Sequence, residues 1–166
     1  MRAATDLSAC PRFSQDTFTR IRNDEFKYHE RTVSELELLH QIVATQPFLK
    51  WMGIEVVDAG PGWVRERLNV KPEFLQPHVV HGGVIYALAD TIAAHSVLTM
   101  TYPKEWTTTV EQKINFLRPI TEGALIGNAR VIHLGNRIVY SEAEVTNEAG
   151  SLVAKSAATL MRLPPR

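Results

Sequence analysis

The sequence predicts an α+β domain in which a curved, mostly antiparallel sheet wraps around one long helix. The stretch from Val79 to Leu98 contains a long apolar run with no polar stripe wide enough to face water, and a helix that is apolar all round is normally buried on every side. About six other segments have the composition of strands, and turn residues separate them. Because only a wrapping sheet covers nearly the whole circumference of a helix, these observations favour this arrangement.

The composition indicates one domain with a short N-terminal appendage. The chain has 166 residues, of which 45% are hydrophobic, and this is enough for a core. Lys plus Arg and Asp plus Glu balance at 18 each. A bulk electrostatic attraction to nucleic acid or to an anionic membrane is therefore not expected.

The N-terminal residues predict a cytoplasmic protein. They lack the long apolar core of a secretory signal, and we expect no later segment to be long and apolar enough to span a bilayer. The single cysteine, Cys10, cannot form an internal disulfide, which is typical of a reducing compartment and excludes a cysteine-based zinc site. An organellar transit peptide stays open because Arg2 and several Ser and Thr residues lie near the start, although Asp6 and Asp16 count against it.

Residues 1–46 are expected to form a partly helical extension, and residues 47–166 the main domain. A weak apolar pattern between Phe18 and Tyr28 indicates a short helix in the extension.

A clearer helix is predicted at the end of the extension. Ser34 and Glu37 have the spacing of a capping box, in which the serine hydroxyl caps the helix start. Apolar residues follow at helical spacing, so we predict a helix from Glu35 to Thr45 that ends before Pro47.

The predicted strands are joined mainly as consecutive hairpins, because turn residues separate them at short intervals. They are 54–59, 63–70, 107–117, 124–134, 137–146 and 151–162. The strand 107–117 alternates most clearly. One face is predicted to carry Val110, Ile114 and Phe116, and the other Thr109, Glu111, Lys113 and Asn115.

Asp90 is the strongest candidate for a catalytic group. It is the single formally charged side chain between His81 and His95 in the apolar helix. A carboxylate in such a setting is costly unless a partner compensates it or it gives up its charge, and enzymes prepare a general base or a nucleophile in this way. The alternative is an N-cap of a new helix after a break, but no Pro or Gly interrupts the run.

Three segments resemble one family. HGGVIYALAD, TTTVEQKINFLRP and GSLVAKSAATLMRL are similar to the hotdog-fold thioesterases of the phenylacetate-pathway type, relatives of the 4-hydroxybenzoyl-CoA thioesterases. The resemblance covers about Phe48 to Leu163. It implies a hotdog fold and hydrolysis of an acyl-CoA thioester to the free acid and CoA, with Asp90 as nucleophile or general base. It also implies no metal and no cofactor, since CoA is part of the substrate.

The glycines before the helix fit thioester hydrolysis, which needs donors at the carbonyl oxygen and a group that attacks or delivers water. Gly82 and Gly83 lie where the helix begins, so their N–H groups are among those without an intrahelical partner. The positive helix end and the missing Cβ let a carbonyl oxygen approach. The resemblance assigns the polarising N–H to Gly82, with Gly83 giving room.

Asp90 lies eight residues after Gly82, which is about 12 Å further along a helix axis. One helix therefore cannot bring both groups to one carbonyl. If both act, Asp90 comes from a second subunit across a two-fold interface with antiparallel helices. The resemblance likewise implies a homodimer whose sheets join edge to edge, often paired into a homotetramer.

The resemblance implies three further catalytic candidates. His81 either shapes the turn before the helix or hydrogen-bonds the substrate. Gln76 resembles a polar residue that helps hold the carbonyl or the water, but the link QPHVV is one residue shorter here, so His78 is an alternative. Thr109 resembles a Ser or Thr near the catalytic carboxylate and is expected to orient Asp90 or water, unless it serves the strand alone.

A CoA ligand demands cations for its phosphates. Arg118, and Asn136 with Arg137 in the next hairpin, resemble the nucleotide contacts of the family. Gly83 and Phe116 complete the predicted substrate-binding set.

Two other functions stay open. A hotdog dehydratase acting on acyl-carrier-protein substrates is expected to pair a catalytic histidine with an acidic residue, and HGG followed by Asp90 fits hydrolysis better. A non-catalytic acyl-CoA sensor is expected to carry a DNA-binding segment, and residues 1–46 show neither a basic stripe nor a convincing helix-turn-helix. The sequence has no Walker loop, dinucleotide-binding glycine motif, HExxH or GxSxG elbow, which counts against NTPases, metalloproteases and serine hydrolases. It does not predict the acyl group.

Overall fold

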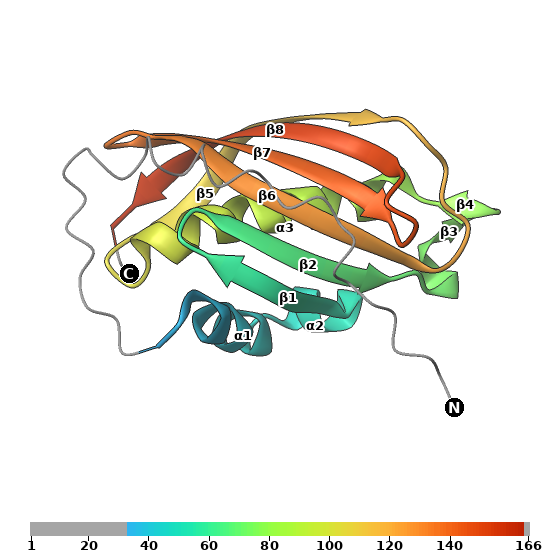
Figure 1. Ribbon diagram of the computed structural model, residues 1–166, viewed down its shortest axis with the longest axis horizontal. Coiled ribbons are helices and arrows are strands. Elements are labelled where there is room, and N and C mark those ends of the chain that lie inside the picture. Colours follow the sequence, from blue (N-terminus) through green and yellow to red (C-terminus); the bar gives the residue numbers. More distant parts are fainter. Residues whose placement is uncertain (1–32, 165–166) are drawn as a thin grey trace. The chain divides into compact units, whose positions relative to one another are not determined.

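The computed structural model describes residues 33–164, which belong to one compact unit, Thr32–Arg166 (Figure 1). Cys10 and the short helix expected between Phe18 and Tyr28 lie outside the described residues. The helix predicted at 35–45 is part of this unit, although we counted it with the extension.

Six antiparallel strands form the main sheet in the order β1-β2-β6-β7-β8-β5, so that β1 and β5 are its edges. Their bounds are β1 Ile54–Gly60, β2 Trp63–Asn69, β5 Trp106–Phe116, β6 Ala124–Leu134, β7 Ile138–Asn147 and β8 Leu152–Leu163. The predicted strands agree with these bounds within one residue at each end. The α+β class is therefore confirmed.

The central helix α3, Gly82–Thr101, lies along the inner face of the sheet (Figure 1). Eleven of its residues are buried, and it continues without a break through Asp90, so Asp90 does not cap a new helix. By length and composition, α3 is long and apolar enough to cross a bilayer. Our expectation that no segment would have these properties was therefore wrong. More than half of its most apolar window is buried inside this unit, however, as in the core helix of a folded domain.

Two short helices lie near β1 in Figure 1, and the first of them, α1, packs against it. Helix α1, Glu35–Thr45, begins where predicted, and the Ser34 hydroxyl accepts a hydrogen bond from the Glu37 N–H at 3.2 Å. Helix α2, Pro47–Met52, was not predicted. We took Pro47 as a stop signal, but here it occupies the first turn of a new helix, where its missing N–H costs nothing.

A small hairpin leads the chain into α3. It consists of the strands β3, Leu75–Gln76, and β4, Val79–Val80, and the short 3₁₀-helix η4, Pro72–Phe74, precedes it. The N–H of His81 donates to the Phe74 carbonyl at 2.8 Å. This hydrogen bond fixes the chain directly before the first turn of α3.

The edge strand β5 contains a bulge that changes its predicted alternation. The pairing with β8 shifts register between Thr109 and Glu111, so Val110 has no partner and is 58% exposed. An extra residue in one strand reverses which side chains face inward beyond it. Thr109 therefore shares the inner face with Ile114 instead of opposing it, and our assignment of faces was wrong at this point.

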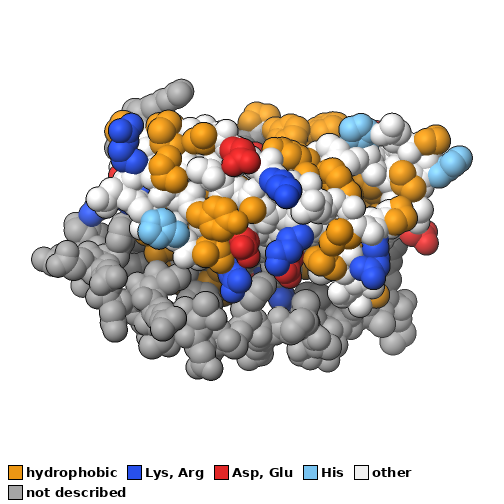
Figure 2. Space-filling view, turned by 90° about the horizontal axis from the view of Figure 1, so that it is seen from above, with side chains coloured by type: hydrophobic (Ala, Val, Ile, Leu, Met, Phe, Trp, Pro, Cys, Tyr) orange, Lys and Arg blue, Asp and Glu red, His pale blue; other side chains and the backbone are white. Residues whose placement is uncertain are grey.

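Figure 2, which views the molecule from above with respect to Figure 1, shows apolar side chains among charges of both signs. Ile132, Ile138 and Tyr140 of β6 and β7 are exposed large apolar side chains. Lys155 and Glu144 form an ion pair on the same sheet, with Nζ and Oε1 3.1 Å apart. Positive and negative charges are therefore mixed on this face, in keeping with the balanced composition.

Candidate active site

A cavity of about 250 Å³ lies beside the middle of α3. Its wall comes from one face of α3, from α2 with the residue before it, and from the start of β5. The lining residues are Gln46, Phe48, Leu49, Ala87, Asp90, Thr91, Ala94, His95, Leu98, Trp106 and Thr107. The cavity thus combines apolar walls with a few polar groups, as small-molecule sites do.

Asp90 is half-buried in this wall and has one neutral partner. The Thr109 hydroxyl of β5 donates to Asp90 Oδ1 at 2.7 Å. This bond holds the carboxylate in one orientation and leaves Oδ2 for a substrate or a water molecule. The bulge at Val110 makes the contact possible, because it lets Thr109 and the inward residues after it face α3.

The first turn of α3 leaves the Gly82 N–H without an acceptor among residues 33–164. The Gly83 N–H donates to His81 Nδ1 at 2.8 Å, and the Val84 N–H donates to the His81 carbonyl at 2.9 Å. His81 therefore caps the helix, because its Nδ1 and its carbonyl both accept hydrogen bonds from the first turn. Gly83 supplies no free donor, so the structure favours Gly82 as the group that can polarise a carbonyl.

A second cavity, of about 360 Å³, opens at this end of α3. It is lined by Val79, Val80, Gly82, Ile85, Phe116, Leu117, Arg118 and Pro119. A Cβ added to Gly82 would lie 3.3 Å from Cζ of Phe116, so glycine keeps the space between them open. Arg118 is exposed, and one of its nitrogens, Nη1, donates to the Leu152 carbonyl at 2.8 Å. Three predicted substrate-binding or polarising residues therefore line one cavity.

Asp90 and Gly82 line different cavities of the same chain. Both belong to one unbroken helix, so their separation along its axis is about 12 Å. A single thioester carbon cannot lie next to both groups of one chain.

Four other predicted residues line neither cavity. Gln76 and His78 are exposed on the β3–β4 hairpin. Asn136 and Arg137 are exposed in the turn between β6 and β7, at the other end of α3 from Gly82. Within one chain the structure does not bring them to Arg118.

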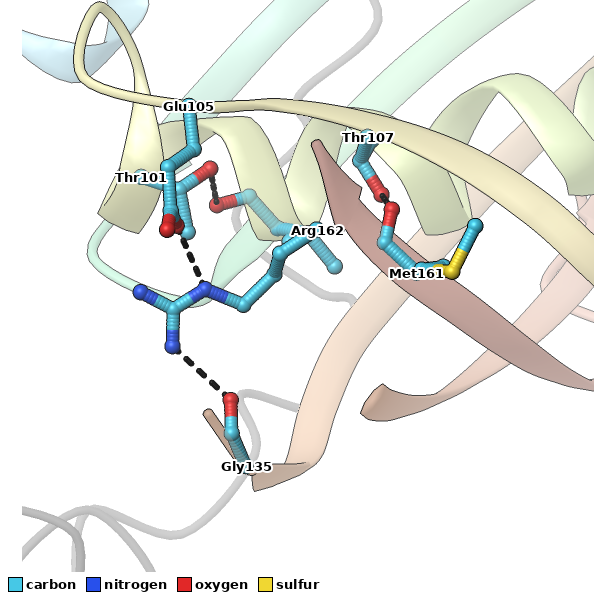
Figure 3. A network of polar contacts seen from close by, with 7 residues as sticks. Thr101, Glu105, Thr107, Gly135, Met161 and Arg162 are labelled. Atoms are coloured by element: carbon cyan, nitrogen blue, oxygen red, sulfur yellow. Dashed lines mark hydrogen bonds and ion pairs between the residues drawn. The ribbon is translucent and has the colours of Figure 1, made fainter. Parts of the chain in front are cut away.

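Figure 3 shows what holds the β6–β7 turn near the C-terminal end of α3. Arg162 of β8 donates from Nη1 to the Gly135 carbonyl at 2.8 Å and from Nε to Oε2 of Glu105 at 2.5 Å. Glu105 lies four residues after the end of α3, and its N–H donates to the Thr101 carbonyl at 3.0 Å. Asn136 and Arg137 are therefore tied to the far end of the helix.

The structure also reveals a polar pair in the cavity wall that we did not predict. His95 of α3, 3% exposed, has its Nδ1 2.5 Å from Oε1 of Glu66 on β2, which is fully buried. One signal in the sequence could have found it. Glu66 alternates with Val64 and Leu68 on the apolar face of its strand, where a lone carboxylate needs a partner.

A dehydratase would need a histidine and an acidic residue that both reach the substrate. Because Glu66 has no exposed surface, only His95 of this pair lines the cavity. Within the part of the chain that the structure describes, no three His, Cys, Asp or Glu side chains are grouped so that they could hold a metal ion.

Residues 78–154 match the thioesterase superfamily. A suspected esterase of Mycobacterium tuberculosis is 31% identical over 132 residues, which represent 74% of this chain and 90% of that protein. Residues 78–154 include the whole of α3, and with it every α3 residue that lines either cavity.

Two solved structures extend the comparison. A thioesterase of Haemophilus influenzae is similar with a TM-score of 0.73 at 28% identity, covering 81% of this chain and 93% of that one. The PaaI protein of the phenylacetic acid degradation operon of E. coli is similar with a TM-score of 0.74 at 22% identity, covering 79% and 94%. At this identity the second likeness bears on the fold alone.

Proposed function

The chain belongs to the thioesterase superfamily and has its hotdog fold, and on this premise we propose that it hydrolyses acyl-CoA thioesters to the free acid and CoA. One observation carries the proposal. Asp90 is a half-buried carboxylate that lines a mostly apolar cavity and accepts a hydrogen bond from one hydroxyl. Its helix begins with Gly82, whose N–H has no acceptor among residues 33–164. These are the two kinds of group that thioester hydrolysis needs.

The proposed reaction assigns each group one task. The Gly82 N–H, at the positive end of α3, donates to the thioester oxygen as negative charge develops on it. Asp90 either attacks the carbonyl carbon, or takes a proton from a water molecule that attacks it. The C–S bond then breaks, the electron pair leaves with sulfur, and CoA thiolate departs. If Asp90 has attacked, water hydrolyses the resulting anhydride, so both routes consume one water and release acid and CoA.

The active enzyme is proposed to be a homodimer, because Asp90 and Gly82 of one chain lie too far apart. Two antiparallel α3 helices around a two-fold axis would place Gly82 of one protomer beside Asp90 of the other and create two identical sites. The edge strand β5 supports this arrangement. It is eleven residues long, has no neighbour on one side within the described unit, and exposes Val110 and Phe116. The unpaired N–H and C=O groups along a long edge strand are a template for pairing with another chain.

The second cavity supplies the proposed route for CoA. Arg118 and Gly82 both line it, so the pantetheine arm is proposed to leave Gly82 through this cavity, and the exposed guanidinium of Arg118 to bind a CoA phosphate beyond the arm. In a dimer, Asn136 and Arg137 of the other protomer are candidates for the remaining phosphate contacts. A pairing of dimers into a tetramer and a cytoplasmic location stay predictions.

The test is thiol release from a panel of acyl-CoA thioesters by the wild type and by Asp90→Asn. Removing the carboxylate should lower kcat by about a hundredfold or more, as loss of a general base or nucleophile does. Asp58→Asn is the matched control, since Asp58 is an exposed carboxylate that accepts a hydrogen bond from the Ala59 N–H at 2.9 Å and lines neither cavity. Hydrolysis by Asp90→Asn at the wild-type rate would contradict the proposal.

The shared site is tested by mixing two inactive variants. Gly82→Val fills the space in front of Phe116, whose ring lies 3.3 Å from the first added carbon. A dimer of one Asp90→Asn chain and one Gly82→Val chain retains one intact site if the site is shared between protomers. Random mixing should then restore about a quarter of the wild-type activity. If each chain carried its own complete site, mixing would restore none.

A further inference from the structure

The pair of His95 and Glu66 is a buried polar group in the cavity wall that the proposed hydrolysis does not use. Glu66 has no exposed surface, and its Oε2 has no hydrogen-bond partner among residues 33–164. His95 lines the cavity that contains Asp90, and its Nδ1 is bonded to Glu66 Oε1 at 2.5 Å. The ring nitrogen Nε2 has no partner within the described residues, so it is available to a group in the cavity.

Packing alone does not account for this pair. Replacing a buried ion pair by apolar residues of similar volume is often neutral or stabilising, and a carboxyl oxygen without a partner is costly in the interior. Neighbouring wall residues such as Leu98 and Leu49 show that apolar side chains fit here. A histidine held by a carboxylate instead resembles the supported polar groups that fix the orientation of a ligand.

The position of His95 places it at a defined distance from the reacting carbon. Ala87, Thr91, Ala94, His95 and Leu98 form one stripe along α3, and Asp90 borders it. His95 follows Asp90 by five residues, which is about 7.5 Å along the helix axis. An extended chain of 1.5 Å bonds advances about 1.25 Å per bond along its axis. An acyl chain that starts at Asp90 and runs along this stripe therefore passes His95 about six single bonds from its carbonyl carbon.

We infer that His95, positioned by Glu66, binds a hydroxyl group on the acyl chain about six bonds from the thioester carbon, and that the site thereby selects hydroxylated acyl-CoA thioesters over unsubstituted ones. With Nδ1–H donated to Glu66, Nε2 accepts a hydrogen bond when the ring is neutral and donates one when it is charged. A hydroxyl is both donor and acceptor, so it pairs with either form. A saturated chain would leave Nε2 without a partner in the cavity wall.

The volume of the cavity suits an acyl group of modest size. A cavity of about 150 Å³ takes up benzene, and this one measures about 250 Å³. Two thioesters of equal length therefore make a suitable pair of probes: 6-hydroxyhexanoyl-CoA, and heptanoyl-CoA, in which a methyl group replaces the hydroxyl. The inference rests on the proposed function for the position of the thioester carbon at Asp90 and for its kinetic readout.

The first measurement is the ratio of kcat/KM for the two thioesters. The wild type should prefer 6-hydroxyhexanoyl-CoA by roughly tenfold to a hundredfold, the range expected for one hydrogen bond to a polarised group. His95→Phe should abolish this preference while it continues to hydrolyse heptanoyl-CoA. Glu66→Gln keeps the ring but replaces its carboxylate partner, so it should reduce the preference by a smaller factor.

Ser96→Ala is the matched control. Ser96 is the next residue of α3 and is buried, but it bonds to Ser141 of β7 at 3.0 Å and does not line the cavity. Its loss should leave the ratio unchanged, even if the protein becomes less stable. A wild type without preference, or a His95→Phe variant that loses both activities equally while remaining folded, would overturn the inference. If His95→Phe does not fold, an unchanged ratio in Glu66→Gln would overturn it.

Binding separates this inference from the proposed activity. Calorimetry with Asp90→Asn should show tighter binding of 6-hydroxyhexanoyl-CoA than of heptanoyl-CoA, and the double variant Asp90→Asn, His95→Phe should not. A wild type that hydrolyses neither thioester but shows this difference in binding would refute the hydrolysis and support the role of His95. Equal binding of both thioesters by Asp90→Asn, with hydrolysis intact in the wild type, would refute only the role of His95.

Discussion

Thr109→Val removes the one hydroxyl that the structure places on Asp90. The side chain keeps its shape, and valine suits a strand at least as well as threonine. The lost bond is short, 2.7 Å between Oγ1 and Oδ1, and its acceptor is a carboxylate. Hydrogen bonds to charged groups contribute about 1.5–3 kcal/mol. If this bond holds the carboxylate in its reactive orientation, kcat should fall roughly tenfold to a hundredfold.

The assay compares kcat, KM and thermal stability across three variants. Thr109→Val should lower kcat with little change in KM, because Thr109 acts through Asp90 and lines neither cavity itself. Thr109→Ser restores the hydroxyl and should recover most of the rate. Thr108→Val is the control, since its side chain is exposed on the other face of β5. A Thr109→Val enzyme with wild-type kcat, or a Thr109→Ser enzyme as slow as Thr109→Val, would refute the reasoning.

Two predictions concern stability. Gly127→Ala should lower the free energy of unfolding by about 1–3 kcal/mol, because the new Cβ would lie 2.8 Å from Cδ1 of the buried Ile92. Ile92→Val removes that Cδ1 atom, so in urea unfolding it should cost less stability in the Gly127→Ala background than in the wild type. Strictly additive effects of the two changes would contradict the clash. Ser34→Ala should lower the free energy of unfolding by about 1 kcal/mol, because it removes the cap of α1. Ser34→Asp keeps an acceptor and should retain most of the stability. Equal losses in both variants would argue against capping.

The elements of this fold follow from local signals. Helix α1 begins where predicted because the Ser34 cap acts within four residues, and the six strands lie within one residue of their predicted positions because turn residues bound them. Among the helix signals, Pro47 misled us, because it both ends one helix and begins another.

The sequence by itself determined that Asp90 lies in a buried helix, eight residues after a glycine with a free N–H, since helix geometry alone sets that spacing. Only the tertiary structure decided what meets Asp90. A bulge at Val110 turns Thr109 toward it. In the same way, Glu66, 29 residues before His95 in the chain, meets the His95 ring in a hydrogen bond. Such contacts depend on the register and packing of segments far apart in the chain, which periodicity within a segment cannot specify.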